Sequence, residues 1–515
     1  MEIGKKVLLI SPRLNYEIAK RVPMQLQENL GVGYLASFLE SKGVDVDILD
    51  LNCSNINLEQ LISLAGNPNY RLIGVSVHSS DDLEDTITFA KDARKVGIKT
   101  HITLGGHYVS RKDIEILSPQ SPIDSIVRGE GEFTLHELYS KVGELSPLNN
   151  IEGLSFKTNG QIIQNKNRHV ITDLDNLPFP KRYNLSEILK SKKKSVHLLT
   201  SRGCPGGCSF CIAPLNKGWR TRSPKNILEE INSLYSQGIR TFTFEDDNYL
   251  GKSILGKERA IQIADKLVDS NLGIKYQISL RADNLDDDLL KKFFDSGVYK
   301  MRVGIESFNQ RQLDLYNKRT NSKYLEDVMQ KIINSGIEPH FSFITFDPYV
   351  SLDELEKGSK IMRKFANNIH FRYVTAPLIP LEGSVIWKNL MKDNLIKQEG
   401  DKCSFRFVNP DSEAVWNMVK QFKEYMTDIE DFSREISNKI SLLNENINDE
   451  ETTKFQKIEK EINFRMTSSW LDILDYSIES VRKNKNYRVT YIPDKIKKQH
   501  DEILEMFDRT NEMRY

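Results

Sequence analysis

Short apolar runs alternate with helical patterns over the first 140 residues. Apolar runs rich in Val, Ile and Leu predict five strands. They lie at residues 6–11, 44–51, 72–79, 99–106 and 124–129. Between them, residues 32–43 and 82–97 carry apolar positions at helical spacing, and both segments end at a glycine, the expected helix stop. This repetition predicts an α/β fold with a Rossmann-like, doubly wound parallel sheet, which binds ligands at the carboxyl ends of its strands.

A second α/β series follows a connector. Residues 141–190 contain the turn-rich run NGQIIQNKNRH and the proline-punctuated LDNLPFPKRY, which predict a linker. Six further apolar runs predict strands, and a helical pattern follows each of the first five. They lie at residues 196–202, 240–247, 275–282, 299–307, 338–346 and 370–378. The repeat predicts a partial (β/α)6, TIM-like barrel with its active site at the strand carboxyl ends.

The alternation gives way to charged, Asn-rich, helix-like sequence near the end of this series. This last region is either a lid over the barrel mouth or a packing collar, and the sequence favours neither. The chain is therefore expected to have four parts. They are a first α/β domain (1–140), a linker (141–190), a barrel (191–390) and a helical C-terminal domain (391–515).

The charges of the 515-residue chain balance, because Lys plus Arg and Asp plus Glu both number 72. No long-range field therefore favours a nucleic-acid partner. The amino-terminal apolar run is too short for a signal peptide, and no stretch reaches the roughly 18 apolar residues of a membrane span. We expect a cytoplasmic protein without a membrane partner.

Three of the five cysteines fall within eight residues, in SRGCPGGCSFC. Cys204, Cys208 and Cys211 directly follow the first strand of the second series, and the intervening glycines let the backbone wrap around a small centre. This clustering indicates a metal site. An iron–sulfur cluster needs only these three thiolates if one iron is left open. A zinc site, the alternative, needs a fourth ligand from Cys53, Cys403 or a histidine.

The C-x-x-x-C-x-x-C spacing, with Phe210 before the last cysteine and on the loop after the first barrel strand, resembles the radical S-adenosylmethionine superfamily. The resemblance implies a four-iron, four-sulfur cluster held by the three cysteines, with S-adenosylmethionine at the open iron and Phe210 beside the cofactors. FEDDNYLG (244–251) resembles the second-strand motif of the family, and it supplies Asp246 and Tyr249 as candidate catalytic residues.

Further strand ends carry the resemblance along the barrel. SLRADNL contains Arg281, and VGIES contains Glu306 and Ser307. The resemblance implies that Glu306 contacts the ribose of S-adenosylmethionine, that Arg281 pairs with its methionine carboxylate, and that Ser307 lies in the same site. An internal salt bridge between Arg281 and Glu306 is the alternative. The fifth strand departs from the family, because Asp347 and Pro348 stand where other members carry Gly-Pro.

The amino-terminal segments LGVGYLASFLESKG, IGVSVHSSDDL, TLGGHYVS and IVRGEGEFTLHEL resemble the cobalamin-binding domain of one radical S-adenosylmethionine subfamily. Glycines at strand ends would let a bulky ligand approach the backbone. The candidate cobalamin-binding residues are Ser76, His78, Ser79, Gly105, Gly106, His107, Gly129, Glu130 and Gly131. The D-x-H-x-x-G motif that supplies a cobalt ligand in many cobalamin proteins is missing, and a domain that has lost cobalamin is the alternative.

The resemblance implies an enzyme that reductively cleaves S-adenosylmethionine to a 5′-deoxyadenosyl radical and uses cobalamin to methylate an unactivated carbon of a small molecule or peptide. The alternative is rearrangement, cyclisation or oxidation without methyl transfer. An external electron donor such as flavodoxin or ferredoxin is expected. A tRNA methylthiotransferase is disfavoured, because such enzymes carry three more cysteines in the first domain. A cofactor sensor without turnover is a competing interpretation from another class.

Overall fold

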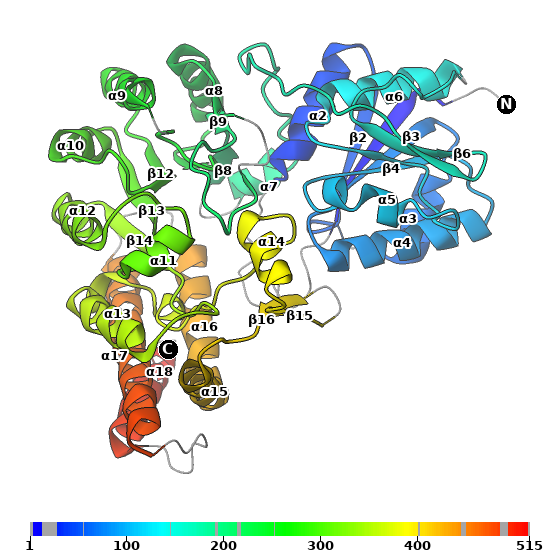
Figure 1. Cartoon of the computed structure of the whole chain (residues 1–515). Helices are drawn as coiled ribbons and strands as arrows, with labels where there is room; N and C mark the ends of the chain where they lie inside the picture. The colour runs from blue at the N-terminus through cyan, green and yellow to red at the C-terminus, as the bar shows by residue number, and fades with distance from the viewer. Residues whose placement is uncertain are drawn as a thin grey trace. The chain divides into compact units, whose positions relative to one another are not determined.

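The chain forms two compact units in the computed structural model (Figure 1). The first comprises Met1–Lys190 with Arg220–Arg222, and the second Ser191–Trp219 with Ser223–Tyr515. The structure describes residues 4–12, 28–54, 56–144, 146–190, 194–213, 218–251, 253–399, 402–443, 450–484 and 493–512. Within these ranges no helix combines the length and the apolarity that crossing a bilayer requires.

The first unit is built on a seven-stranded sheet of order β2-β1-β3-β4-β5-β6-β7. Its first five strands are parallel and confirm the five predicted strands. They are β1 (Lys6–Ser11), β2 (Asp45–Asp50), β3 (Tyr70–Ser76), β4 (His101–Gly105) and β5 (Ser125–Val127). The other elements are α2 (Leu30–Ser41), α3 (Leu58–Ala65), α4 (Ser80–Lys95), η1 (Val109–Arg111), α5 (Asp113–Ile116), α6 (Glu132–Glu144), α7 (Leu185–Lys190) and β10 (Arg220–Thr221).

Both faces of this sheet are covered by helices. Leu8 and Ile10 of β1 belong to a core that includes residues of α3 and α4, whereas Val7 and Leu9 belong to a second core with α2 and α6. Burial on both faces explains the continuous apolar run of β1. β2 lies on one side of β1, whereas β3, β4 and β5 follow on the other side, so the strand order changes direction between β1 and β3. Such a switch point opens a crevice at the carboxyl ends of the strands.

The segment predicted as a linker extends this sheet. β6 (Leu154–Thr158) and β7 (Gln161–Gln164) form an antiparallel hairpin, and β6 pairs antiparallel with β5. Asn159 and Gly160 turn the hairpin with positive φ angles of 49° and 75°. An Asn-Gly pair between two apolar runs is a strong hairpin signal, and the sequence interpretation gave it too little weight.

The second unit contains a five-stranded parallel sheet of order β14-β13-β12-β11-β8. Its strands are β8 (Ser195–Leu198), β11 (Thr241–Phe244), β12 (Lys275–Arg281), β13 (Val298–Glu306) and β14 (Glu338–Phe343), and the short β9 (Ser201–Arg202) follows β8. The helices of the repeat are α8 (Pro224–Ser236), α9 (Ile254–Asp269), α10 (Asp287–Asp295), α11 (Gln310–Leu315), α12 (Ser322–Asn334), α13 (Leu352–Lys364) and α14 (Val385–Lys392). Most of these helices follow one side of the sheet (Figure 1).

The sixth predicted strand, residues 370–378, does not form. Its chain makes the 3-10 turn η4 (Phe371–Tyr373). Instead of a strand ladder, this part of the chain has the isolated bridges Phe341–Ile369 and Phe346–Pro377 and a side-chain contact between His340 and Tyr373. Pro377 has no N–H to donate to a ladder. The Ile369 carbonyl is bound instead by side chains of the C-terminal region.

The C-terminal region packs against this edge of the sheet. It comprises β15 (Ile396–Glu399), β16 (Lys402–Phe405), α15 (Pro410–Tyr425), α16 (Thr427–Leu443), α17 (Glu450–Asn484) and α18 (Asp494–Glu512). α17 contacts α13, η3 (Ala366–Asn368) and η4. Asn463 Nδ2 and Thr467 Oγ1 both donate to the Ile369 carbonyl, each at 2.9 Å. This arrangement supports the collar over the lid, because α17 packs on α13 and on the 3-10 turns that take the place of a sixth strand.

We expect the double variant Asn463→Ala/Thr467→Val to lower the free energy of unfolding by about 1–3 kcal/mol, because the buried Ile369 carbonyl loses both donors. The urea midpoint, followed by tryptophan fluorescence, measures the effect, and Trp470 lies on the same helix. Thr427→Val is the control: Thr427 is exposed and donates to the Lys423 carbonyl four residues earlier, at the end of α15, so a shift within about 0.5 kcal/mol is expected. Equal midpoints for both variants would contradict the collar.

Candidate cofactor-binding site

The cysteine loop, residues 204–211, presents three partly exposed free thiols. Each sulfur accepts one N–H hydrogen bond. The donors are Gly206 N to Cys204 Sγ at 3.4 Å, Arg281 Nη1 to Cys208 Sγ at 2.6 Å and Ala213 N to Cys211 Sγ at 3.3 Å. Hydrogen bonds to sulfur are typical of thiolates that hold iron–sulfur clusters, where they tune the reduction potential.

The loop does not stabilise bare thiolates. Burial raises the pKa of Cys204 and raises that of Cys211 to about 11, and the neighbouring Cys208 and Asp247 add to both shifts. These thiols are therefore neutral at pH 7 without a ligand, and a bound metal would displace their protons. The zinc alternative requires a fourth ligand. In the described ranges no group of three or more His, Cys, Asp or Glu side chains, the three cysteines included, is already arranged around one metal position, and no fourth ligand for zinc is grouped with them.

A turn directly after α11, here called the buttress (residues 315–318), anchors the cysteine loop from outside. Ser209 donates through its backbone N to the Tyr316 carbonyl at 3.0 Å and through Oγ to the Leu315 carbonyl at 2.6 Å. Asn317, with φ 51°, donates from Nδ2 to the Gly207 carbonyl at 2.7 Å. The sequence interpretation missed the buttress. An asparagine after a helix end is only a weak signal of a left-handed cap, and the contact joins segments about a hundred residues apart.

Phe210 and Arg281 also bind the buttress. The Phe210 ring lies edge-on to the Tyr316 ring, with centroids 5.6 Å apart. Arg281 Nη2 donates to the Lys318 carbonyl at 2.6 Å, while its Nε pairs with Asp283 at 2.7 Å. Through Nη1 on Cys208 and Nη2 on Lys318, Arg281 links the cysteine loop to the buttress, an arrangement suited to positioning the cysteines.

Glu306 has a different partner from Arg281, so the alternative of a salt bridge between them is wrong. Glu306 Oε1 lies 3.3 Å from Nζ of the buried Lys318. Its backbone has φ 70°, at a register shift in the pairing of β13 with β14. A non-glycine residue in this conformation costs about 1–3 kcal/mol, and such strain clusters at functional sites.

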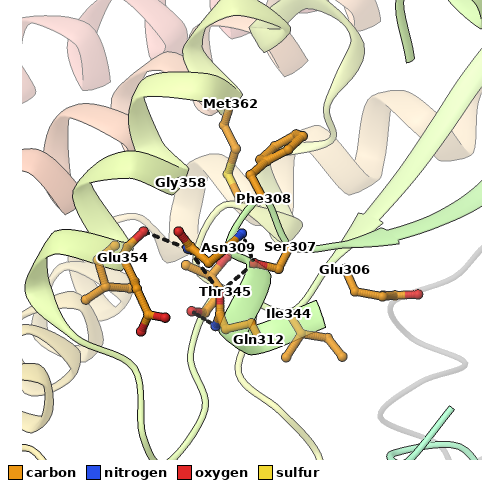
Figure 2. Close-up of a pocket in the computed structure, with 11 residues that line it drawn as sticks. Glu306, Ser307, Phe308, Asn309, Gln312, Ile344, Thr345, Glu354, Gly358 and Met362 are labelled. Carbon is orange, nitrogen blue, oxygen red and sulfur yellow. Dashed lines mark hydrogen bonds between the residues drawn. The ribbon is translucent and has the colours of Figure 1, made fainter. Parts of the chain in front are cut away.

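Ser307 points into a different environment from Glu306. Its Oγ donates to Gln312 Oε1 at 2.5 Å and accepts from Asn309 N at 3.0 Å. These residues line a small pocket beside α13, and Figure 2 shows Glu306 directed away from that cluster. Ser307 therefore stabilises the backbone that directly follows Glu306.

Asp246 and Tyr249 occupy structural positions. Asp246 is buried and accepts from the backbone N of Thr200 at 2.8 Å and of Ser201 at 2.7 Å, which fixes the chain leading into the cysteine loop. Tyr249 is fully buried against Phe244. Glu245 and Asp247 are the exposed carboxylates at this strand end, and the charge of Asp247 acts on Cys204 and Cys211.

In the first unit, polar groups gather at the switch-point strand β3. Asn29 Nδ2 lies 3.2 Å from Ser76 Oγ and 3.0 Å from His78 Nε2, and Ser76 Oγ lies 3.0 Å from the same nitrogen. Partial desolvation lowers the pKa of His78, so the imidazole is neutral at pH 7. Asn29 was not predicted, and it also caps α2. Ser79 caps α4 in a capping box with Asp82.

The strand-end glycines fall into two groups. Gly106, at φ 112°, is required by packing, because a Cβ there would lie 2.4 Å from the Val77 carbonyl oxygen, and a Cβ at Gly131 would lie 3.0 Å from Leu35. Gly105 and Gly129 differ: a Cβ at Gly105 meets nothing closer than 3.8 Å, and one at Gly129 meets nothing within 4 Å. The open space at these two positions fits a ligand that covers the backbone.

The remaining two candidates have different surroundings. Glu130 is engaged inside the first unit, where it pairs with Arg220 at 2.9 Å and accepts from Ile171 N at 2.7 Å. His107 is exposed at the end of β4, next to Gly106. Glu130 therefore fastens residues 220–222 to the first unit, whereas His107 faces solvent.

Comparison with known proteins agrees with both units. A family model of the radical SAM superfamily matches residues 198–358, and one of the B12 binding domain matches residues 19–139. An uncharacterized methyltransferase of Pyrococcus horikoshii is 30% identical over 398 residues, which cover 76% of this chain and 84% of that protein. The chain belongs to the cobalamin-dependent radical S-adenosylmethionine enzymes.

One further sequence relative and one solved structure also resemble the chain. An anaerobic magnesium-protoporphyrin IX monomethyl ester cyclase of Synechocystis is 26% identical over 385 residues, covering 72% of this chain and 75% of the cyclase. The solved structure of the cobalamin-dependent S-adenosylmethionine radical enzyme OxsB, with aqua-cobalamin and S-adenosylmethionine bound, superposes with a TM-score of 0.70. At 19% identity, over 98% of this chain and 84% of that chain, it supports the shared fold.

Family membership gives this radical S-adenosylmethionine enzyme its cofactors: a 4Fe–4S cluster, S-adenosylmethionine and cobalamin. Enzymes of the superfamily act with an external reductant. The donor set of the second unit fits the cluster, because three hydrogen-bonded thiols lie on one anchored loop. The open glycine backbone of the first unit fits a broad, flat ligand.

Gly105 and Gly106 give a matched test of whether the open glycine backbone of the first unit holds cobalamin. We expect Gly105→Ala to weaken cobalamin binding at least tenfold without changing the thermal midpoint, because its Cβ fills open space. Gly106→Ala should instead lower the midpoint, because its Cβ meets the Val77 carbonyl and its φ is positive. Cobalamin absorbance after gel filtration and differential scanning fluorimetry measure the two effects. Unchanged cobalamin retention in the folded Gly105 variant would show that cobalamin does not cover the backbone at this position.

Proposed function

We propose that this enzyme methylates an unactivated carbon of a small-molecule or peptide substrate. The observation that carries the proposal is the cysteine loop, in which Cys204, Cys208 and Cys211 each accept one N–H and the backbone is anchored from the buttress. When bound, the cluster and S-adenosylmethionine supply the substrate radical and cobalamin supplies the methyl group. The protein contributes binding, orientation and exclusion of water.

The residues around the loop have separate tasks in this proposal. Arg281 holds Cys208 in place and keeps a positive charge beside the cluster. Asp247, exposed near two of the thiols, is suited to the ammonium group of S-adenosylmethionine. Glu306 is suited to its ribose, because a carboxylate fixed by Lys318 and a strained backbone keeps one orientation for the hydroxyl groups.

The first unit would hold cobalamin at the carboxyl ends of β3, β4 and β5. Gly105 and Gly129 leave the backbone open, and Asn29, Ser76 and His78 offer polar groups at the switch point. His78 Nε2 already lies within hydrogen-bond distance of both neighbours. We therefore assign His78 a hydrogen-bonding role rather than cobalt ligation.

Cyclisation or rearrangement without methyl transfer is the second candidate, because the Synechocystis relative is a cyclase. Both candidates need a one-electron donor, for which a flavodoxin or ferredoxin is proposed. The five cysteines are free in the structure, as expected in a reducing compartment such as the cytoplasm.

Replacing cysteines one at a time tests the cluster site. We expect Cys204→Ala, Cys208→Ala and Cys211→Ala to lose most of the iron and the cluster absorbance after anaerobic reconstitution, because a cuboidal cluster cannot stay bound with two protein thiolates. Cys53→Ala and Cys403→Ala are the controls and should keep the wild-type iron content. Zinc in place of iron in the wild-type protein, or loss of iron in the controls, would refute the assignment.

Methyl transfer is tested with S-adenosylmethionine carrying a deuterated methyl group. The reconstituted enzyme, a chemical reductant and hydroxocobalamin, which carries no methyl group of its own, are incubated with a desalted extract of small molecules and peptides from the native host. We expect 5′-deoxyadenosine and a product heavier by the labelled methyl group, and neither with Cys208→Ala. 5′-Deoxyadenosine with an unlabelled product would favour the second candidate, and the absence of 5′-deoxyadenosine would exclude both.

A further inference from the structure

The inner face of the second sheet, opposite its buried apolar face, is lined with polar side chains in register. Ser279 of β12, Arg302 of β13 and His340 of β14 are direct cross-strand neighbours. Side chains that alternate with them, such as Ile278 and Met301, are fully buried on the other face. The inner face therefore carries a row of three polar groups across three adjacent strands.

Two ionisable groups near this row have partners of their own. Lys300, one row below, pairs with Glu338 at 2.8 Å, and Glu245 of the loop after β11 pairs with His197 at 2.8 Å. Arg302 is exposed, and among the residues that the structure describes no carboxylate lies within ion-pairing distance of it. Its guanidinium therefore forms no ion pair with a described residue, although its charge, added to the hydrogen bond from His197, lowers the pKa of Glu245.

The neighbours of Arg302 add hydrogen-bonding groups without adding charge. His340 Nε2 lies 2.9 Å from the Tyr373 hydroxyl. Burial, together with the charges of Lys300 and Arg302, lowers the pKa of His340 to about 4, so its imidazole is neutral at pH 7. Glu338 is the acidic group nearest His340 on its own strand and is already paired. A guanidinium beside a hydroxyl and a neutral imidazole suits an oxyanion.

We propose that Arg302, with Ser279, His340 and Tyr373, binds an oxyanion of the substrate, either a carboxylate or a phosphate ester. That this oxyanion belongs to the substrate rests on the function proposed above. Arg302 lies four residues before Glu306 on β13, roughly 13 Å at the rise of a strand. The subsite would thus hold the charged end of the substrate deep in the sheet, with its reacting carbon nearer the strand carboxyl ends.

Binding of small probes to the reconstituted full-length enzyme tests the subsite. The probes are phenyl phosphate, benzoate and neutral benzyl alcohol, titrated by ligand-observed NMR under anaerobic conditions. We expect one anion to bind with a millimolar Kd and benzyl alcohol not to bind. Arg302→Gln should weaken that anion at least tenfold, with Arg302→Lys intermediate, and the preferred probe identifies the substrate as a carboxylate or a phosphate ester.

Lys300→Gln is the matched control, because it removes a paired positive charge one row away, and it should change the Kd by less than twofold. Equal iron content and thermal midpoints show that the variants are folded. The subsite is refuted if neither anion binds the wild-type enzyme, if benzyl alcohol binds as well as the anions, or if Arg302→Gln binds normally. Formation of 5′-deoxyadenosine by the wild-type enzyme is measured separately, so failure of the proposed function remains distinguishable from failure of the subsite.

Discussion

The site in the second unit depends on how a glycine-rich loop is held by a turn far along the chain. Residues 204–211 contain three glycine or proline positions between the cysteines, and glycine loses more conformational entropy on folding than any other residue. Hydrogen bonds from Ser209 and Asn317, together with the Arg281 guanidinium, offset that cost. The backbone that carries the three sulfurs is thus fixed from outside the loop.

Both units contain polar strand-end residues that stabilise the fold and other strand-end positions that are left available to a ligand. Asp246, Ser307 and Glu130 are strand-end polar residues, yet each is engaged in hydrogen bonds or ion pairs within its own unit. Arg302 is exposed and forms no ion pair within the described ranges, and Gly129 leaves open space. A polar residue near a strand end is therefore better judged by its remaining hydrogen-bonding and charge capacity than by its position alone, since a satisfied group has little free energy to offer a ligand.

Local sequence signals predicted most of the architecture. All five parallel strands of the first sheet and the five strands of the second were predicted, because their apolar runs reflect burial. The β6–β7 hairpin carried a local Asn-Gly signal that was underestimated. The sixth strand failed for a non-local reason: α17, about a hundred residues further on, binds the Ile369 carbonyl that a strand would otherwise use.

The sequence by itself determined the two α/β units, the position of the three cysteines after the first strand of the second series, and the glycines at the ends of the first-unit strands. Hydrophobic periodicity and residue spacing are local properties of the sequence, so these features could be predicted without knowing which distant residues are in contact. Only the tertiary structure decided that Arg281 binds Cys208 while Glu306 binds Lys318, that the buttress anchors the cysteine loop, and that Arg302 forms no ion pair with the residues that the structure describes. Pairing between side chains depends on which strands become neighbours and in which register, and that is fixed by packing across the whole unit.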